Sequence, residues 1–227
     1  MAKIDLKIDW CSHKAAKYAC EHWHYSKCIP KSKLVKLGVW EYGKYIGCVI
    51  FGSGATPNLC KPYGLTQTTC CELVRVALTS HENSVSRIMA VSLRFLKKIN
   101  PNLRLVVSFA DGSQGHHGGI YQACNWVYNG TTPKARFYMI NGKLTHPRTL
   151  GNVGLTQNIQ GARTLDRKAE TVEVQGKYRY LMPLDKEMKE QIAILAKPYP
   201  KRVKQAMTSN HEEQRQCDTD LPAPKEN

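Results

Sequence analysis

The stretch from Leu105 to Trp126, LVVSFADGSQGHHGGIYQACNW, constrains the fold and the site more than any other part of the sequence. Its apolar run indicates a buried strand, and this strand ends at Asp111. A glycine-rich loop follows up to Gly119, where an aromatic segment indicates a short helix. Ligands of open α/β sheets bind beyond the carboxyl ends of the strands, so this connection predicts a functional site. The alternative is a structural connection in which Asp111 only caps the backbone.

Further elements of both kinds surround this stretch. The spacing of apolar residues predicts other helices at residues 12–23, 83–99 and 185–196. The β-rich runs predict strands at 35–40, 45–51, 71–79, 127–131 and 135–146, and one within KYRYLMP. The first two strands are expected to form a hairpin around Tyr42-Gly43. Strand-helix-strand units after a hairpin predict an α/β fold with a mixed central sheet and helices on both faces.

The apolar pattern also suggests where the domain ends. We expect one domain over residues 1–207, with a basic extension from about residue 148, where the pattern weakens. Residues 208–227 lack apolar periodicity and predict a disordered tail. The first predicted element starts at Ser12, and the residues before it contain no signal-peptide core.

The excess of positive charge narrows the class of partner. The chain carries 33 Lys and Arg against 18 Asp and Glu, a formal net charge of +15. Such a chain favours nucleic acid, because its cations displace counterions from phosphates. A charge that only keeps the protein soluble is the alternative. No apolar run approaches membrane-spanning length, so we expect no membrane partner.

The nine cysteines indicate a reduced, cytoplasmic protein. Their number is odd, Cys70 and Cys71 are adjacent, and no C-x-x-C motif occurs, which argues against a disulfide framework and a zinc ribbon. We expect Cys70 and Cys71 to be small core residues, with a redox role left open.

Arg75 lies among apolar residues of the strand predicted at 71–79 and therefore needs an anionic partner. Glu72 is three residues away, on the opposite face of a regular strand. The expected partner is Asp111 on the neighbouring strand, or a phosphate or carboxylate of a ligand. A purely structural Arg75–Asp111 ion pair is an equal alternative.

The segment EHWHYSK places aromatic and basic residues side by side. This pattern allows a base to stack while lysines bind phosphates. We expect Trp23 to pack in the core, with His24 and Tyr25 facing the site and Lys27, Lys31 and Lys33 binding DNA. A metal site of His22 and His24, with iron or zinc, needs ligands that the spacing does not identify. The adjacent His116 and His117 point in different directions and would rarely bind one metal ion.

Several long segments resemble the Mom family of Mu-like bacteriophages, in the same order along the chain. They are WHYSK, KLVKLGVWE, GATPNLCKPYGLTQTTCCELVRVALT, LRLVVSFADGSQGHHGGIYQACNWVY, KYRYLMPLDKEMK and PYPKR. The resemblance extends from about His22 to Lys204. It implies a GNAT-like single domain with a mostly antiparallel sheet. It also implies an enzyme that converts adenine in DNA to an N6-carbamoylmethyl (acetamido) derivative in the host cytoplasm, which protects phage DNA from restriction.

The resemblance implies a set of functional residues: His24, Tyr25, Arg75, Ser86, Asp111 and Tyr121. We expect Asp111 to accept the N6 proton, Tyr25 to stack on a flipped adenine and Tyr121 to donate to an oxyanion. Ser86 and the amides after Val85 would hold the donor's polar end. Ser108 is expected to bind substrate, and Lys201 and Arg202 to bind phosphates.

The group donor stays open. It is an activated glycyl or aminoacyl unit, with tRNA as a possible carrier, or acetyl-CoA, and iron is a further option. The segment TSHENSVSRIM lacks the glycine that GNAT enzymes use to bind the pyrophosphate of coenzyme A. The alternatives are an acyl- or aminoacyltransferase acting on another amine and a non-catalytic DNA-binding protein. The oligomeric state is not predicted.

Overall fold

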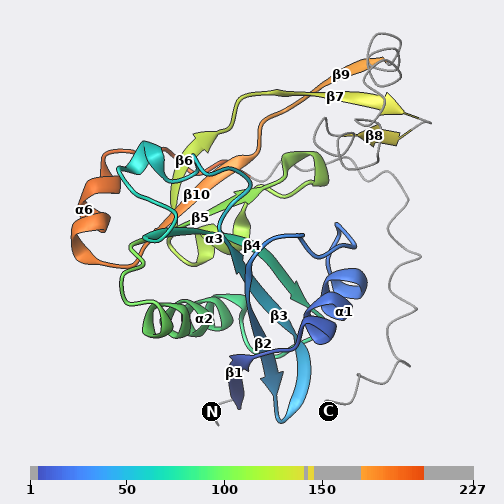
Figure 1. Cartoon of the computed structure of the whole chain (residues 1–227), viewed down its shortest axis with the longest axis vertical. Coiled ribbons are helices and arrows are strands. Elements are labelled where there is room, and N and C mark those ends of the chain that lie inside the picture. The colour runs from blue at the N-terminus through green and yellow to red at the C-terminus, as the bar shows by residue number, and fades with distance from the viewer. Residues whose placement is uncertain (1–4, 141–142, 146–169, 202–227) are drawn as a thin grey trace.

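The computed structural model describes residues 5–140, 143–145 and 170–201 (Figure 1). Within these residues the helices are α1 (His13–Trp23), α2 (Val85–Ile99), α3 (Gly119–Ala123) and α6 (Lys186–Ala193). Two short 3-10 helices are η1 (Lys61–Tyr63) and η2 (Gly112–Gln114). The strands of the main sheet are β1 (Leu6–Trp10), β2 (Leu34–Glu41), β3 (Lys44–Gly52), β4 (Cys70–Leu78), β5 (Leu105–Ala110), β6 (Val127–Thr131) and β10 (Tyr178–Pro183).

The main sheet has the strand order β1-β2-β3-β4-β5-β10-β6. Neighbouring strands are antiparallel except β4 and β5, which run parallel. The long crossover through α2 joins this parallel pair, as parallel strands require. The predicted α/β class with a mixed, mostly antiparallel sheet is therefore confirmed.

Helices cover both faces of this sheet, as predicted. Side chains alternate along each strand, so Val106 of β5 packs with α2 and α3 on one face. Its neighbour Val107 packs with α6 on the other face, where α1 covers β2 to β4. Figure 1 shows α1 and α2 on opposite sides of the sheet.

The hairpin of β2 and β3 forms as predicted, with nearly the predicted bounds. Its turn places Tyr42 at φ +50° and Gly43 at φ +77°. Two consecutive left-handed residues match the right-handed twist of the flanking strands. Ser12 caps α1 by accepting from the Ala15 amide at 3.1 Å, and Asp185 caps α6 from its predicted position.

The order of the strands differs from the chain order near the carboxyl end. β10 inserts between β5 and β6, so part of the segment expected as an extension belongs to the main sheet. A separate sheet contains β7 (Ala135–Ile140), β8 (Lys143–Thr145) and β9 (Thr171–Val174). β1, a five-residue strand at the edge of the sheet, was not predicted, although its alternating apolar and charged residues are a strand pattern. The predicted tail and the Asn141-Gly142 turn lie outside the described residues, and the domain boundary stays a prediction.

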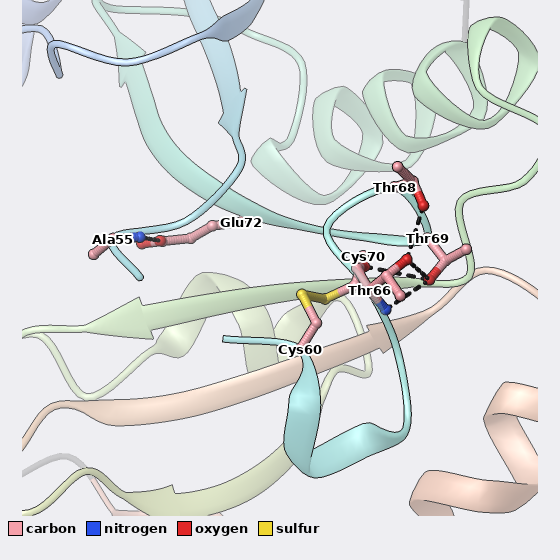
Figure 2. Close-up of a disulfide and its surroundings, with 7 residues drawn as sticks. All are labelled: Ala55, Cys60, Thr66, Thr68, Thr69, Cys70 and Glu72. Atoms are coloured by element: carbon pink, nitrogen blue, oxygen red, sulfur yellow. Dashed lines mark hydrogen bonds between the residues drawn. A yellow bond between two sulfur atoms is a disulfide. The ribbon is translucent and has the colours of Figure 1, made fainter. Parts of the chain in front are cut away.

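A disulfide joins Cys60 to Cys70, both fully buried (Figure 2). The expectation of a wholly reduced chain was wrong for this pair. The loop 53–69 brings Cys60 to the start of β4, a contact that the sequence spacing does not reveal. Cys71 is a free thiol packed against the core, as predicted.

Candidate active site

A cavity of about 480 Å³ opens where β4 and β5 separate. The parallel pairing of these strands ends at Leu73 and Ser108, although both strands continue beyond it. The volume of the cavity lies in the range of roughly 300–1,000 Å³ found for small-ligand sites. The cavity is lined by Trp23, His24, Tyr25, Val74, Arg75, Val76, Phe109, Ala110, Asp111, Gly115, His116, His117, Gly118, Gly119, Ile120 and Tyr121. Five of the predicted site residues therefore share one cavity.

Asp111 both caps the backbone and lines this cavity. Its Oδ1 accepts from the Ser113 amide at 3.1 Å and from the Ser113 hydroxyl at 2.6 Å. Its Oδ2 lies 2.8 Å from Lys177 Nζ, and the side chain is 17% exposed. Burial alone would raise the pKa of Asp111, but the bonds from Lys177 and Ser113 outweigh it and lower this pKa. Asp111 is therefore an anion at neutral pH.

The predicted Arg75–Asp111 ion pair does not form. Arg75 Nε donates to the Cys28 carbonyl at 3.3 Å, and Nη1 donates to the Val74 carbonyl at 2.7 Å. Arg75 is half-buried at the cavity wall, so its charge does not need a direct carboxylate partner. The cation that pairs with Asp111 comes from Lys177, just before β10.

Glu72 was expected on the face opposite to Arg75, and this was wrong. The register of β3 and β4 shifts between Ile50 and Phe51, which marks a β-bulge. Leu73 and Val76 consequently pack into the same core, so Glu72 and Arg75 share the other face. Figure 2 shows the Glu72 carboxylate accepting from the Ala55 amide, at 3.2 Å. Burial raises the pKa of Glu72, and the nearby charge of Arg75 partly offsets this.

His24 directly follows α1 and lies in a tight turn at the cavity wall. Its Nδ1 is 2.8 Å from the Ser26 hydroxyl and accepts from the Ser26 amide at 3.1 Å. Lys27 adopts φ +47°, and its amide donates to the His24 carbonyl at 2.9 Å. Burial, with the charges of Arg75, His116 and Lys27, lowers the pKa of His24 to about 4. His24 is therefore neutral at physiological pH.

Tyr25 lies at the rim of the cavity with 48% of its surface exposed. Its ring centroid is 4.4 Å from His24 and 5.1 Å from His116. The sequence does not assign a role to His116, because its approach to Tyr25 depends on the fold of the glycine-rich loop. Trp23 packs against Tyr45 at 6.1 Å, as expected, and also contributes to the cavity wall.

Tyr121 forms a buried wall of the cavity. Burial raises the pKa of its hydroxyl to about 12, so it stays protonated. This hydroxyl is 2.8 Å from Ser108 Oγ, which is also 2.9 Å from the Leu73 carbonyl. Ser108 is fully buried and does not line the cavity, so its observed contacts position Tyr121.

Ser86 does not line the cavity either. It lies in the first turn of α2, with its hydroxyl 3.0 Å from Ser84 Oγ. The amides of Glu82 and Asn83 before this helix donate to the Glu41 carboxylate at 2.9 and 2.7 Å. Glu41 is only 6% exposed. The protein's own carboxylate thus occupies two amides of the turn before α2.

The predicted DNA-binding lysines lie in two groups. Lys27, Lys31 and Lys33 are exposed on the turn that follows α1 and leads to β2. Lys201 is exposed beside Pro200, whose carbonyl accepts from Gln122 of α3 at 3.2 Å. Arg202 lies outside the described residues.

No group of three or more His, Cys, Asp or Glu side chains suited to a metal ion occurs among the residues that the structure describes. His22 is exposed, and its Nδ1 lies 2.9 Å from the Tyr18 carbonyl within α1. In the same part of the chain, no helix has the length and apolar character to cross a membrane.

Comparison with known proteins identifies the family. The Mom protein family matches residues 5–201. The methylcarbamoylase Mom of Escherichia phage Mu is 25% identical over 204 residues, which cover 87% of this chain and 84% of that protein. Solved structures similar to this chain include spermidine N-acetyltransferase from Vibrio cholerae in complex with CoA and spermine, at a TM-score of 0.43 and 10% identity, covering 78% of this chain and 95% of that one. Arabidopsis thaliana NAA60 in complex with a bisubstrate analogue matches at a TM-score of 0.45 and 9% identity, covering 80% and 100%. From the match over residues 5–201, the chain belongs to the Mom protein family.

Proposed function

We propose that the protein is a phage enzyme that modifies adenine in DNA at its exocyclic N6. The group added is a carbamoylmethyl (acetamido) group, and its role is to protect phage DNA from host restriction. The proposal starts from the family and from the related methylcarbamoylase. The observation that carries it is the cavity shared by the strand-end Asp111 and the exposed ring of Tyr25, with exposed lysines on the chain that follows Tyr25.

Adenine N6 is a poor nucleophile because its lone pair is conjugated into the ring, so it must lose a proton as it forms its bond to carbon of the activated donor. The bond between this carbon and the donor's leaving group breaks, and the leaving group departs with the bonding electrons. Asp111 is anionic, lines the cavity and is our candidate for accepting this proton. Lys177 would hold the carboxylate in place through its 2.8 Å contact. Arg75 would fix the turn that carries His24, since it binds the Cys28 carbonyl.

A base inside a duplex cannot reach such a cavity. We therefore infer that the target adenine is flipped out, at a cost of a few kcal/mol, and stacks on Tyr25. The exposed lysines on the turn after α1 and Lys201 near α3 would bind the flanking phosphates. The group donor would enter the same cavity, because the Glu41 carboxylate already accepts from two backbone amides of the turn before α2.

Mass analysis of nucleosides tests the function directly. DNA from cells that produce the wild-type protein should contain adenosine carrying the mass of a carbamoylmethyl substituent, and DNA from cells with Asp111→Asn should not. An acetyl increment would point to plain acyl transfer. Unmodified DNA together with tight DNA binding would support a non-catalytic binding protein.

A further inference from the structure

We propose that the Ser26 amide fixes His24 as a neutral ring with its proton on Nε2, so that His24 serves the reaction as a hydrogen-bond donor. The acceptor is an oxygen or ring nitrogen of the bound reactants. This inference rests on the proposed function for its chemistry, but the tautomer itself follows from contacts within the protein.

The first step is the direction of one hydrogen bond. A backbone N–H can only donate, and the Ser26 amide lies 3.1 Å from His24 Nδ1. Nδ1 must therefore present its lone pair to this amide. A neutral imidazole carries one proton, so that proton belongs to Nε2.

The second step is the rigidity of the turn that makes this bond. Lys27 holds the left-handed conformation, and its amide closes the turn on the His24 carbonyl. The next residue, Cys28, accepts from Arg75 Nε at 3.3 Å, which ties the turn to β4. The ring is thus oriented by its own turn and by the strand beside the cavity. In this assignment Ser26 and Arg75 are positioning residues.

The third step is the charge around the ring. His24 is surrounded by Arg75, His116 and Lys27, and together with burial these groups keep the imidazole neutral. A general base or a metal ligand at Nε2 would need that nitrogen without its proton, which is the reverse of what the turn imposes. A neutral N–H donor is what remains.

The bonding of Tyr121 shows why the reaction would need another hydrogen-bond donor. Ser108 Oγ lies within hydrogen-bond distance of both the Leu73 carbonyl and the Tyr121 hydroxyl, but its single proton can serve only one of them. The carbonyl can only accept, so when Ser108 donates to it, the 2.8 Å contact with Tyr121 takes the Tyr121 proton. The oxyanion role expected of Tyr121 would then fall to His24, which lines the same cavity.

Isosteric variants test the donor role. The side-chain amide of glutamine places an N–H where Nε2 lies, whereas alanine and asparagine place none there. His24→Gln should keep activity within about tenfold of the wild type, whereas His24→Ala and His24→Asn should lose roughly 10²–10³-fold, the cost of one oxyanion donor. Equal loss of activity in all three variants would overturn the proposal. Glutamine supplies an N–H but cannot act as a base, so such a loss would mean that His24 acts as a base.

Nitrogen NMR of the histidine-labelled protein tests the tautomer without any substrate. We expect the His24 Nε2 signal in the protonated range and Nδ1 in the unprotonated range, both constant from pH 5 to 8. Ser26→Ala keeps the backbone amide and should leave these signals unchanged. A protonated Nδ1, or titration within that range, would refute the assignment. This result stands whether or not the protein modifies DNA, so it separates the tautomer from the proposed function.

Three DNA analogues identify the acceptor. If the acceptor is a ring nitrogen of adenine, one of 1-deaza-, 3-deaza- and 7-deazaadenine in the substrate should abolish the difference between the wild type and His24→Ala. If it is an oxygen of the donor group, the difference should remain with all three analogues. Equal rates of wild type and His24→Ala on normal adenine would exclude either acceptor.

Discussion

The Lys177 ammonium lies 2.8 Å from the Asp111 carboxylate, at the point where β5 ends and β10 begins beside it. Lys177 thus takes the place that the sequence suggested for Arg75. This ion pair keeps the proposed base Asp111 in its anionic form. Arg75 instead donates to the Cys28 carbonyl and so holds the turn that carries His24.

Replacement of Lys177 should change the pH dependence of activity. Burial opposes ionisation of Asp111, and the bond from Lys177 is the strongest of the contacts that lower its pKa. Without Lys177 this pKa rises, so the acidic limb of kcat/KM should move to higher pH in Lys177→Met. Lys134→Met removes an exposed ion pair with Glu173 and is the matched control. An acidic limb that stays in place in Lys177→Met would exclude Asp111 as the base.

Asp111→Asn should abolish modification with little effect on the fold. Asparagine caps helices about as well as aspartate, so η2 should persist. Loss of a general base costs roughly 10²–10⁴-fold in rate. Nucleoside mass analysis measures the activity, and thermal unfolding followed by circular dichroism checks the fold. Full activity in a folded Asp111→Asn protein would show that another group accepts the proton.

Removal of the Tyr25 ring should weaken activity on duplex DNA. Stacking of an aromatic ring on a base contributes roughly 1–3 kcal/mol, so Tyr25→Ala should lower kcat/KM by about 5- to 150-fold. Tyr25→Phe keeps the ring and should stay near the wild type. Comparable activity of Tyr25→Ala and Tyr25→Phe would show that the exposed ring does not hold the base.

The common cavity of Arg75, Asp111 and Tyr121 could be predicted from the sequence, because strand ends and the following loop meet where parallel strands separate. The partner of Asp111 could not, since Lys177 is brought there by a strand that inserts out of chain order. The shared face of Glu72 and Arg75 depends on a bulge, which has no signal in the strand pattern.

For Ser86 and Ser108, the sequence did not reveal the direction of the hydroxyl groups. The family resemblance implied a role for Ser86, and Ser108 was expected to bind substrate, but burial and local capping decide where a hydroxyl points. Ser108 is sealed beneath Tyr121, and Ser86 lies near the cap of α2. The contribution of Ser26 has no signal in the sequence, because it is a backbone amide, which every residue type except proline would supply.

His24 should make the protein less stable as the pH falls. Its pKa is about 4 in the folded protein, against an ordinary value of 6.5. Between these values the unfolded chain binds the proton and the folded chain does not, so the free energy of unfolding decreases as the pH falls through this window. His24→Gln should flatten the pH dependence there, while His22→Gln, at an exposed position of α1, should leave it unchanged. Denaturant unfolding at pH 4.5 to 7.5 measures the effect, and identical slopes in the wild type and His24→Gln would contradict it.

Reduction of the Cys60–Cys70 disulfide should lower the thermal stability. The bond closes a loop across a sequence separation of 10 residues, and loop-closure entropy assigns such a bond roughly 2–3 kcal/mol. For a chain of this size the Tm should fall by about 5–10 °C when reductant is added. The double variant Cys60→Ser, Cys70→Ser should melt at the lower temperature with or without reductant, whereas Cys124→Ser, which lacks only a free thiol, should keep the response. A wild-type Tm that does not change when reductant is added would show that packing alone holds the loop. Such packing is present, since Cys60 and Tyr63 lie in one buried cluster with α6.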